Sequence, residues 1–546
     1  MGAEGKKENS FILQAGVLAM AGIIVRIIGM LYRSPLTAII GDEGNGYYSY
    51  AYNIYANILL ISSYSIPSAI SKVMAQKLAL KEYRNAHRIF RCALVYVTVV
   101  GILASLFAFF AAPFLVVDNA VVVLRVFAPT IFLSGFLGVL RGYFQAQGSM
   151  VQTSLSQIIE QILNALVSIG AAYGFIQLAH AEDTTARAIY GASGSALGTG
   201  CGVVAALLFM FYMYMINKDT ILKKAEKDQH SEVDSYAAIS KTILFVVTPF
   251  ILSTFIYNCT TAVNQTIYTE IVMKTHEYTQ QDAAVLYGVF SGKAVLLRNV
   301  PVALASAMSS AIIPGVTAAW STGQKKDARR KVEQAMRMTM LIAIPASFGL
   351  AFFSKPIIMC LFHQKATLQL ASLILTSLSV TVCFYCISTI TNGVLQSIEQ
   401  VNKPVTHAAI ALGVQAIVLV VFLKFTGVGL YGLVIADVVY SVLMCVLNGY
   451  TIKKKLHYKQ EWMDTFLKPA ICSAIVGLIT FGIYKLLDYL TGMFFLAMVI
   501  AIGIFIVLYF VLILLSGGVT EQEVRAFPKG HILVKIAKKL HLLRQI

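Results

Sequence analysis

Two arginines stand inside the first long apolar stretch of the sequence, residues 11–40. This stretch can span a bilayer, because about 20 apolar residues cross the hydrocarbon core, and it holds Arg26 and Arg33. An arginine at that depth costs free energy, so we expect it to face a cavity or a partner. The seven-residue spacing, two helical turns, places both on nearly the same face. Because a guanidinium matches phosphate well, the pair favours an anionic, phosphate-bearing ligand. The alternative is two structural arginines paired with carboxylates or helix ends.

A polar stripe marks a later apolar run, residues 151–178. Its members recur at helical spacing on one face: Gln157, Glu160, Gln161, Asn164 and Ser168. Polar side chains in a spanning helix must face protein or water. The stripe therefore predicts either the lining of a hydrophilic passage for sugars or hydrogen bonds that hold helices together. Glu160 is its only carboxylate and a candidate counter-charge for Arg26 or Arg33.

Two further runs carry polar side chains at helical spacing. In residues 241–270 they are Tyr257, Thr261, Asn264 and Tyr268. In residues 47–80 they are Tyr48, Tyr52 and Tyr55, near the expected outer end. Tyrosines at that level are typical of the aromatic belt of membrane proteins. The belt is therefore the preferred interpretation of the second group.

Positive charge recurs in the second half of the chain. Lys293 and Arg298 lie in residues 284–320, and a spacing of five residues points them to different faces of an α-helix. With Arg26 and Arg33 they would put positive charge on both halves of the protein. Asp437, in residues 428–452, is a carboxylate at membrane depth, which predicts either an ion site or a local partner for another side chain.

The composition identifies the class of protein that must position these residues. Of 546 residues, 58% are hydrophobic and 13% are charged, and the mean hydropathy is +0.74. Soluble proteins carry about a quarter charged residues, so the chain is a polytopic membrane protein. The net charge of +17 does not indicate a nucleic-acid partner, because Lys and Arg cluster in short segments between apolar runs. Cytoplasmic loops show this pattern, and they touch anionic lipid headgroups.

Apolar runs of spanning length predict an all-α polytopic membrane protein with about 14 transmembrane helices. Besides the runs above, they are residues 89–116, 121–146, 190–216, 337–360, 368–398, 404–426, 467–489 and 493–516. Basic segments alternate with loops poor in Lys and Arg, such as Gly41–Gly46, so both termini are expected in the cytoplasm. Apolar and basic side chains at helical spacing near the C-terminus predict a helix lying on the inner leaflet.

The chain also repeats itself at a spacing of six predicted helices. Residues 66–71 resemble residues 300–305, and a basic loop follows each. Parallel repeats of this kind build two-lobed transporters with a cavity near the midplane. The predicted organisation is a first lobe, a cytoplasmic linker, a second lobe, an extra helix pair and a basic amphipathic tail. These correspond to residues 1–216, 217–241, 242–452, 453–516 and 517–546.

Sequence signatures of enzymes are absent. The chain has neither the phosphate loop G-x-x-x-x-G-K-[ST] nor H-E-x-x-H. Cys383 and Cys386 form a C-x-x-C inside an apolar run without a second pair or nearby histidines, so we interpret them as small apolar filler. We expect no enzyme activity, no metal and no cofactor. Energy for transport would come from an ion gradient, the membrane potential or substrate turnover.

Several motifs together resemble a known family. Residues 140–150, LRGYFQAQGSM, are similar to the RGYFQG…M signature of polysaccharide transporters. Residues 156–161, SQIIEQ, resemble the SQxxEQ that accompanies it, and residues 46–52 and 66–72 resemble the block of the second helix. The chain thus resembles the stage V sporulation protein B and YtgP-like group. That group belongs to the multidrug/oligosaccharidyl-lipid/polysaccharide exporter superfamily, and the resemblance covers nearly the whole chain.

This resemblance implies a V-shaped fold of two pseudo-symmetric six-helix lobes plus two C-terminal helices. It implies a flippase that moves an undecaprenyl-pyrophosphate-linked oligosaccharide, lipid II or a related envelope precursor, to the outer leaflet by alternating access. Arg26 and Arg33 look similar to the first-helix arginines of the related MurJ flippases. The candidate substrate-binding residues are Arg26, Arg33, Lys293, Arg298, Glu160, Gln157, Asn164 and Asn264.

Two other functions are weighed against the flippase. A cation-coupled multidrug exporter of the same fold would need carboxylates for organic cations, whereas the first helix carries arginines. In a membrane scaffold without transport, the buried arginines would have no evident function, although inserting them into the bilayer costs free energy. The expected partners are a lipid-linked pyrophosphate, membrane lipids and a coupling ion, with no nucleic acid. The expected form is a monomer in the bacterial cell membrane.

Overall fold

The structure is a computed structural model, and it describes residues 21–22, 24–64, 66–180, 183–228, 234–275, 278–362, 364–458 and 460–519. Nearly all of these residues are helical, which confirms the all-α prediction. The chain forms two compact units, Met1–Gly288 and Val289–Ile546. The boundary falls within a stretch that is helical on both sides.

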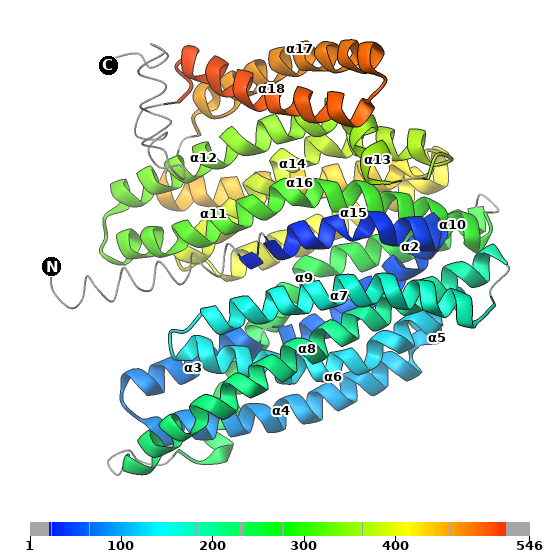
Figure 1. Cartoon of the computed structure of the whole chain (residues 1–546). Coiled ribbons are helices and arrows are strands. Elements are labelled where there is room, and N and C mark those ends of the chain that lie inside the picture. Colours follow the sequence, from blue (N-terminus) through cyan, green and yellow to red (C-terminus); the bar gives the residue numbers. More distant parts are fainter. Residues whose placement is uncertain are drawn as a thin grey trace. The chain divides into compact units, whose positions relative to one another are not determined.

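The first unit consists of long helices that run side by side (Figure 1). A helical segment, Ile24–Leu31, comes first and is bent by 47° from the helix after it. The remaining elements are α2 (Arg33–Leu59), η1 (Leu60–Tyr64), α3 (Ile66–Ala79), α4 (Tyr83–Phe110), α5 (Ala112–Leu115), α6 (Asp118–Ala146), α7 (Val151–Leu178), α8 (Thr184–Lys227), α9 (Tyr236–Thr275) and α10 (Gln280–Tyr287). Helix α7 packs along α8, and α6 packs between α4 and α8.

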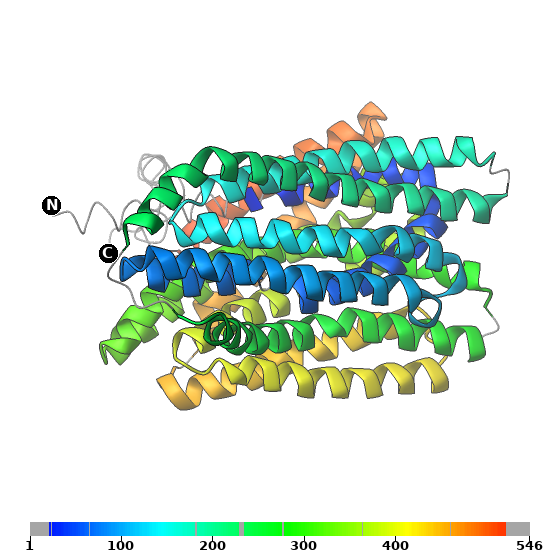
Figure 2. The same cartoon turned by 90° about the horizontal axis from the view of Figure 1, so that it is seen from below.

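The second unit is built in the same way, and Figure 2 shows its long helices aligned when viewed at right angles to Figure 1. A π-helical segment, η2 (Gly288–Val295), leads into it. Its other elements are α11 (Leu296–Ser321), α12 (Lys325–Phe352), α13 (Ser354–Leu361), α14 (Leu368–Ser397), α15 (Asn402–Phe425), α16 (Tyr431–Leu456), η3 (Met463–Leu467), α17 (Lys468–Thr491) and α18 (Phe494–Leu515).

Helix length and composition confirm a multi-span membrane protein. Within the described residues, 11 helices are long and apolar enough to cross a membrane, or 12 if the bent pair Ile24–Leu31 and Arg33–Ser62 is one span. The predicted number of about 14 is not confirmed. Residues 11–20 of the first run and residues 520–546 of the basic tail lie outside the described residues. The placement of both termini in the cytoplasm stays a prediction.

A single glycine stands where the sequence predicted an outer loop. Gly41 has φ 71° and ψ 179°, a region that is essentially restricted to glycine. The residues after it are helical, and Asp42 and Glu43 are buried rather than exposed in a loop. This corrects the prediction for Gly41–Gly46. Gly46 lets α10 cross α2 closely, because a Cβ there would overlap the carbonyl of Ala284.

The RGYF motif lies at the crossing of α3 and α6. A Cβ on Gly142 would stand 2.8 Å from the carbonyl oxygen of Pro67, so the two helices approach this closely only with glycine. The Tyr143 ring is buried, with its centroid 4.7 Å from that of Phe90 and 5.3 Å from that of Tyr214. Burial of such aromatic surface is a main source of packing energy. This part of the motif therefore supports the fold.

The extra helix pair is part of the second unit. Helices α17 and α18 pack on each other and on α12. The Tyr509 hydroxyl of α18 donates to the Leu341 carbonyl of α12 at 3.1 Å. Helix α9, by contrast, lies with the first unit. The predicted lobe boundary at residues 217–241 rests on the internal repeat and stays a prediction.

Candidate functional site

Arg33, the first residue of α2, is half-buried among neutral groups. It donates to Asn45 Oδ1 at 3.1 Å, and its guanidinium lies 4.5 Å from the centroid of the Tyr48 ring. Arg26 lies on the segment Ile24–Leu31 in an exposed position. The 47° bend falls between the two arginines. The straight helix assumed for their shared face is therefore corrected to a bent one.

A chain of polar contacts connects the Arg33 environment to the stripe on α7. The Tyr48 hydroxyl lies 3.5 Å from Thr199 Oγ1 on α8. Thr199 donates to Asn164 Oδ1 at 3.3 Å, and Ser168 donates to the same oxygen at 2.9 Å. Asn164 and Ser168 are buried. In this half of the stripe the side chains hold α7 to α8, as one of the two sequence interpretations expected.

The other half of the stripe has a different role. Glu160 forms an ion pair with Arg141 of α6 at 2.6 Å, and Arg141 also donates to Ser156 at 2.9 Å. The ion-pair partner of Glu160 is thus Arg141, which corrects its assignment as counter-charge of Arg26 or Arg33. Sequence reasoning noted Arg141 only as part of a family signature.

The stripe also meets the first helical segment. A Cβ on Gly29 would lie 3.1 Å from Gln161 Nε2, so glycine gives this amide room beside the helix. Gly29 lies between Arg26 and Arg33 in the sequence. Gln157 is half-buried on the same helix as Gln161. The Gln161 amide is therefore near the helical segment that carries Arg26.

The tyrosines of α2 form an internal aromatic cluster. Tyr48 and Tyr55 are almost fully buried. The Tyr55 ring stacks on Phe127 of α6 with centroids 4.6 Å apart, and the Tyr48 centroid lies 5.5 Å from the same ring. Buried rings packed on a neighbouring helix are not a membrane-interface belt. The belt interpretation of Tyr48, Tyr52 and Tyr55 is wrong for the first and last of these.

Helix α9 is hydrogen-bonded to α2 through a residue next to Asn264, the residue that the sequence analysis predicted. Asn264 is buried, and its neighbour Gln265 is hydrogen-bonded to α2. Asn53 of α2 donates to Gln265 at 2.7 Å and to the Tyr287 hydroxyl of α10 at 2.9 Å. The side chain of Tyr257 lies outside the described residues. The sequence signal for Gln265 was its place beside Asn264 in a spanning helix.

In the second unit, Lys293 is completely buried in η2. Its ammonium donates to Thr367 Oγ1 at 2.9 Å and lies 5.5 Å from the centroid of the Phe362 ring. The π-helical winding of η2 has i→i+5 hydrogen bonds, so residues five apart lie nearer to one face than in an α-helix. The π winding ends at Val295, however, and Arg298 lies beyond it in α11, so the prediction that Lys293 and Arg298 point to different faces stands.

Arg298 of α11 forms a buried ion pair with Asp437 of α16. The Tyr385 hydroxyl of α14 donates to the same carboxylate at 2.7 Å, and the guanidinium lies 4.4 Å from the centroid of the Tyr385 ring. Buried charges of this kind are stable only when paired and hydrogen-bonded. Of the two interpretations left open for Asp437, the structure shows the local partner.

The second unit also contains an apolar cavity of about 920 Å³. It lies among α12, α14, α16 and the start of α17, with Phe348, Phe384 and Val446 on its walls. Lys453 and Gln460 are among its polar lining residues. Within the described chain, no three His, Cys, Asp or Glu side chains gather closely enough to hold a metal ion.

Solved structures with the same fold define the class. The inward-closed structure titled lipid II flippase MurJ matches with a TM-score of 0.64 at 16% identity, over 91% of this chain and 97% of that chain. An inward-facing multidrug resistance MATE family transporter of the MOP superfamily matches with a TM-score of 0.65 at 16% identity, over 81% and 99%. The chain therefore has the fold of MOP-superfamily transporters.

Residues 86–501 match the family described as Lipid II flippase MurJ, and the chain belongs to this family. Lipid II flippase MurJ of Bacillus subtilis is 22% identical over 500 residues, 88% of each chain. Stage V sporulation protein B of the same organism is 24% identical over 545 residues, 97% of this chain and all of the relative. These matches confirm the resemblance drawn from the motifs. The family is one of flippases, not of enzymes.

Proposed function

We propose that this protein flips an undecaprenyl-pyrophosphate-linked oligosaccharide from the cytoplasmic to the outer leaflet by alternating access. Lipid II or a related envelope precursor is the cargo. The observation that carries the proposal is Arg33. It is half-buried at membrane depth and, within the described residues, has no ion pair. A guanidinium kept without a carboxylate suits an anionic ligand, and its donor fork fits phosphate oxygens.

The contrast with the other arginines sharpens this assignment. Arg141 is neutralised by Glu160, and Arg298 by Asp437. We propose that Arg33 contacts the pyrophosphate directly, and that Glu160, through its ion pair with Arg141, positions α6 and α7 within the same unit. Asn45 Nδ2, a buried donor next to Arg33 with no partner in the described chain, could bond a further oxygen of the ligand or a water. We propose Arg26 as a further cation for the ligand in the first unit, and Lys293 and Arg298 as separate candidates in the second unit.

The polar and apolar surroundings fit the rest of such a cargo. Gln157, Asn164 and Asn264 supply amides of the kind that hydrogen-bond sugars. The lipid tail can remain in the bilayer or occupy an apolar cavity, and the second unit has one of about 920 Å³. We further propose a monomer in the bacterial cell membrane with both termini in the cytoplasm.

A cation-coupled multidrug exporter of the MATE type is the second candidate, and the fold similarity to such transporters favours it. An organic cation would need a carboxylate not already neutralised by an arginine. The two carboxylates that the sequence analysis placed at membrane depth, Glu160 and Asp437, are both in ion pairs with arginines. The buried Asp42 and Glu43, by contrast, remain candidates for an organic cation.

Complementation of a bacterial strain depleted of its own lipid II flippase tests the proposal. The parent chain should restore growth, and Arg33→Ala should not, at equal amounts of protein in the membrane. Export of ethidium from the same cells, measured by fluorescence, tests the second candidate. Ethidium export without rescue of growth would refute the flippase and support the exporter. Rescue by Arg33→Ala as complete as by the parent would refute the role of Arg33.

A further inference from the structure

A groove of about 520 Å³ lies between α4 and the beginning of α9, entirely within the first unit. Its lining residues are Arg91, Cys92, Val95, Tyr96, Val99, Val100, Tyr236 and Ser240. Val95 and Val99 are 65% and 54% exposed. In a chain that spans a membrane, apolar side chains exposed in this way mark contact with lipid. The groove therefore has an apolar wall that faces hydrocarbon.

One end of the groove is cationic and rich in donors. Arg88 and Arg91 lie close to Tyr236, and their positive charges lower the pKa of its hydroxyl. The Arg88 guanidinium also lies 4.1 Å from the centroid of the Tyr236 ring. Arg91 is exposed, and Ser240 adds a hydroxyl one helical turn after Tyr236. None of the described lining residues is acidic.

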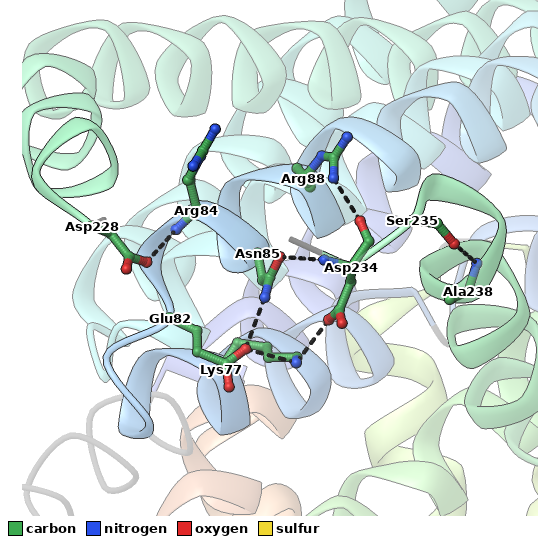
Figure 3. Close-up of polar contacts among 9 residues, drawn as sticks. All are labelled: Lys77, Glu82, Arg84, Asn85, Arg88, Asp228, Asp234, Ser235 and Ala238. Carbon is green, nitrogen blue, oxygen red and sulfur yellow. Dashed lines mark hydrogen bonds and ion pairs between the residues drawn. The ribbon is translucent and has the colours of Figure 1, made fainter. Parts of the chain in front are cut away.

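Polar contacts at the turn between α3 and α4 hold the beginning of α9 in place (Figure 3). We call these five residues, Lys77, Glu82, Asn85, Arg88 and Asp234, the clamp. Lys77 Nζ lies 2.7 Å from carboxylate oxygens of both Glu82 and Asp234. The Asp234 amide donates to Asn85 Oδ1 at 3.1 Å, and Arg88 donates to the Asp234 carbonyl at 2.6 Å.

The clamp ends two residues before Tyr236, so it fixes the aromatic wall of the groove. Ser235, the next residue, accepts from the Ala238 amide at 3.2 Å and caps the helix start. These contacts are all made within the protein. The groove is thus preorganised, which reduces the entropy lost when a molecule binds.

Along the groove, a positively charged residue at one end is followed by apolar residues. Arg91, Val95 and Val99 recur every four residues on one face of α4. Eight residues of helix cover about 12 Å, so the groove leads from headgroup level into the hydrocarbon. We propose that this groove binds an anionic phospholipid, with the phosphate against Arg91 and one acyl chain along Val95 and Val99. The charge bias of the loops makes this the cytoplasmic leaflet, which is rich in anionic lipid. The site is independent of the cargo bound at Arg33.

Fluorescence quenching by brominated lipids tests the proposal on the full chain. Trp320 and Trp462 are first replaced by phenylalanine, and a single probe is introduced by Val95→Trp. Leu103→Trp gives the matched control, since it is 62% exposed on the same helix and two turns deeper. Each protein is placed in vesicles of dioleoylphosphatidylcholine containing dibrominated phosphatidylglycerol or dibrominated phosphatidylcholine. Quenching gives the relative affinity of the two lipids at each position.

At position 95 we expect phosphatidylglycerol to bind about fivefold more tightly than phosphatidylcholine. One basic side chain near the headgroups contributes about 1 kcal/mol to the binding of an anionic lipid, which corresponds to this factor. The preference should vanish in Arg91→Gln and persist in Arg91→Lys. It should also persist in Arg84→Gln, which removes an exposed cation from the same end of α4. Position 103 should show no preference.

An equal preference at positions 95 and 103, or one that survives Arg91→Gln, would overturn the site. The probe at position 103 reports whether Arg91→Gln is inserted and folded like the parent. Addition of undecaprenyl pyrophosphate distinguishes the occupants. If it displaces phosphatidylglycerol from position 95 at equal concentration, the groove belongs to the cargo, and the phospholipid assignment is wrong.

Discussion

Arg33 meets Asn45 and Tyr48 across a reversal of the chain at Gly41. The guanidinium donates to Asn45 at 3.1 Å, although twelve residues of straight α-helix would separate the two backbones by about 18 Å. The break at Gly41 brings the second half of α2 back alongside the first. The contact between Arg33 and Asn45 therefore depends on the backbone conformation of one glycine.

Gly41→Ala should destabilise the protein by about 1–3 kcal/mol, because the φ of 71° and ψ of 179° are strained for a residue with a Cβ. Thermal unfolding in detergent measures the effect. Gly22→Ala is the control, since a Cβ there meets open space and alanine favours the helix. Equal melting temperatures for Gly41→Ala and the parent would contradict this account of the turn.

Arg33→Ala should weaken binding of a purified lipid-linked pyrophosphate by about 1.5–3 kcal/mol, the worth of a charged hydrogen bond. This corresponds to roughly tenfold to a hundredfold in affinity. Arg33→Lys should recover little, because a point charge does not reproduce the planar fork. Arg125→Ala, which removes a half-buried arginine lying over the ring of Phe109, should bind like the parent. Native mass spectrometry of the complexes gives the affinities, and parent-like binding by Arg33→Ala would exclude direct contact.

Asp437→Asn should destabilise the second unit strongly, by about 3–5 kcal/mol, because it leaves the buried Arg298 charge without its partner. The double variant Arg298→Met, Asp437→Leu should cost far less, since it removes both charges. Asp327→Asn breaks a surface pair with Lys331 and should cost about 1 kcal/mol or less. Thermal unfolding compares the three. If Asp437→Asn were no worse than Asp327→Asn, the buried pair would not be structural.

Acid should loosen the clamp. The hydrogen bonds from Lys77 and Asn85 lower the pKa of Glu82 below its ordinary value of 4.5. A lowered carboxyl pKa means that the stabilisation is fully present above the ordinary value and is lost as the pH falls through the lowered one. Hydrogen exchange of residues 234–240, corrected for its intrinsic pH dependence, should rise below about pH 4.5 in the parent. Glu82→Gln should show no such step, and a step of the same size there would assign it to another group.

The predicted orientation can be tested by labelling. Cysteines introduced at Ser231 and Thr184, in a background without reactive native cysteines, should react with an impermeant maleimide from opposite sides of the membrane. Ser231 lies in the basic linker and should label only from the cytoplasm. Labelling of both from one side would contradict the predicted topology in the middle of the chain.

The helices could be predicted because a bilayer leaves the backbone few choices. Every N–H and C=O in hydrocarbon must be paired within the chain, so the length of an apolar run decides where a helix lies. Several candidate site residues could also be predicted, because an arginine or aspartate inside an apolar run costs free energy and is therefore expected to have a partner or a function. Arg33, Arg298 and Asp437 were found in this way.

The pairing of these residues could not be predicted, because it depends on which helices pack together. Glu160 meets Arg141 rather than Arg33 because α7 presents it to α6. Tyr55 is buried because Phe127 of the same neighbour stacks on it. The reversal at Gly41 required a backbone conformation that a glycine permits but does not dictate. Hydrophobic periodicity contains none of this information.

The π-helical turns have a consequence for the way related sequences are aligned. A π turn corresponds to one residue inserted into an α-helix, and one residue rotates everything beyond it by about 100°. Lys293 lies inside such a turn, η2. A relative that lacks the inserted residue would show a one-residue gap within a spanning helix. A lysine aligned there without the gap would point to a different neighbour, even though the residue type is unchanged.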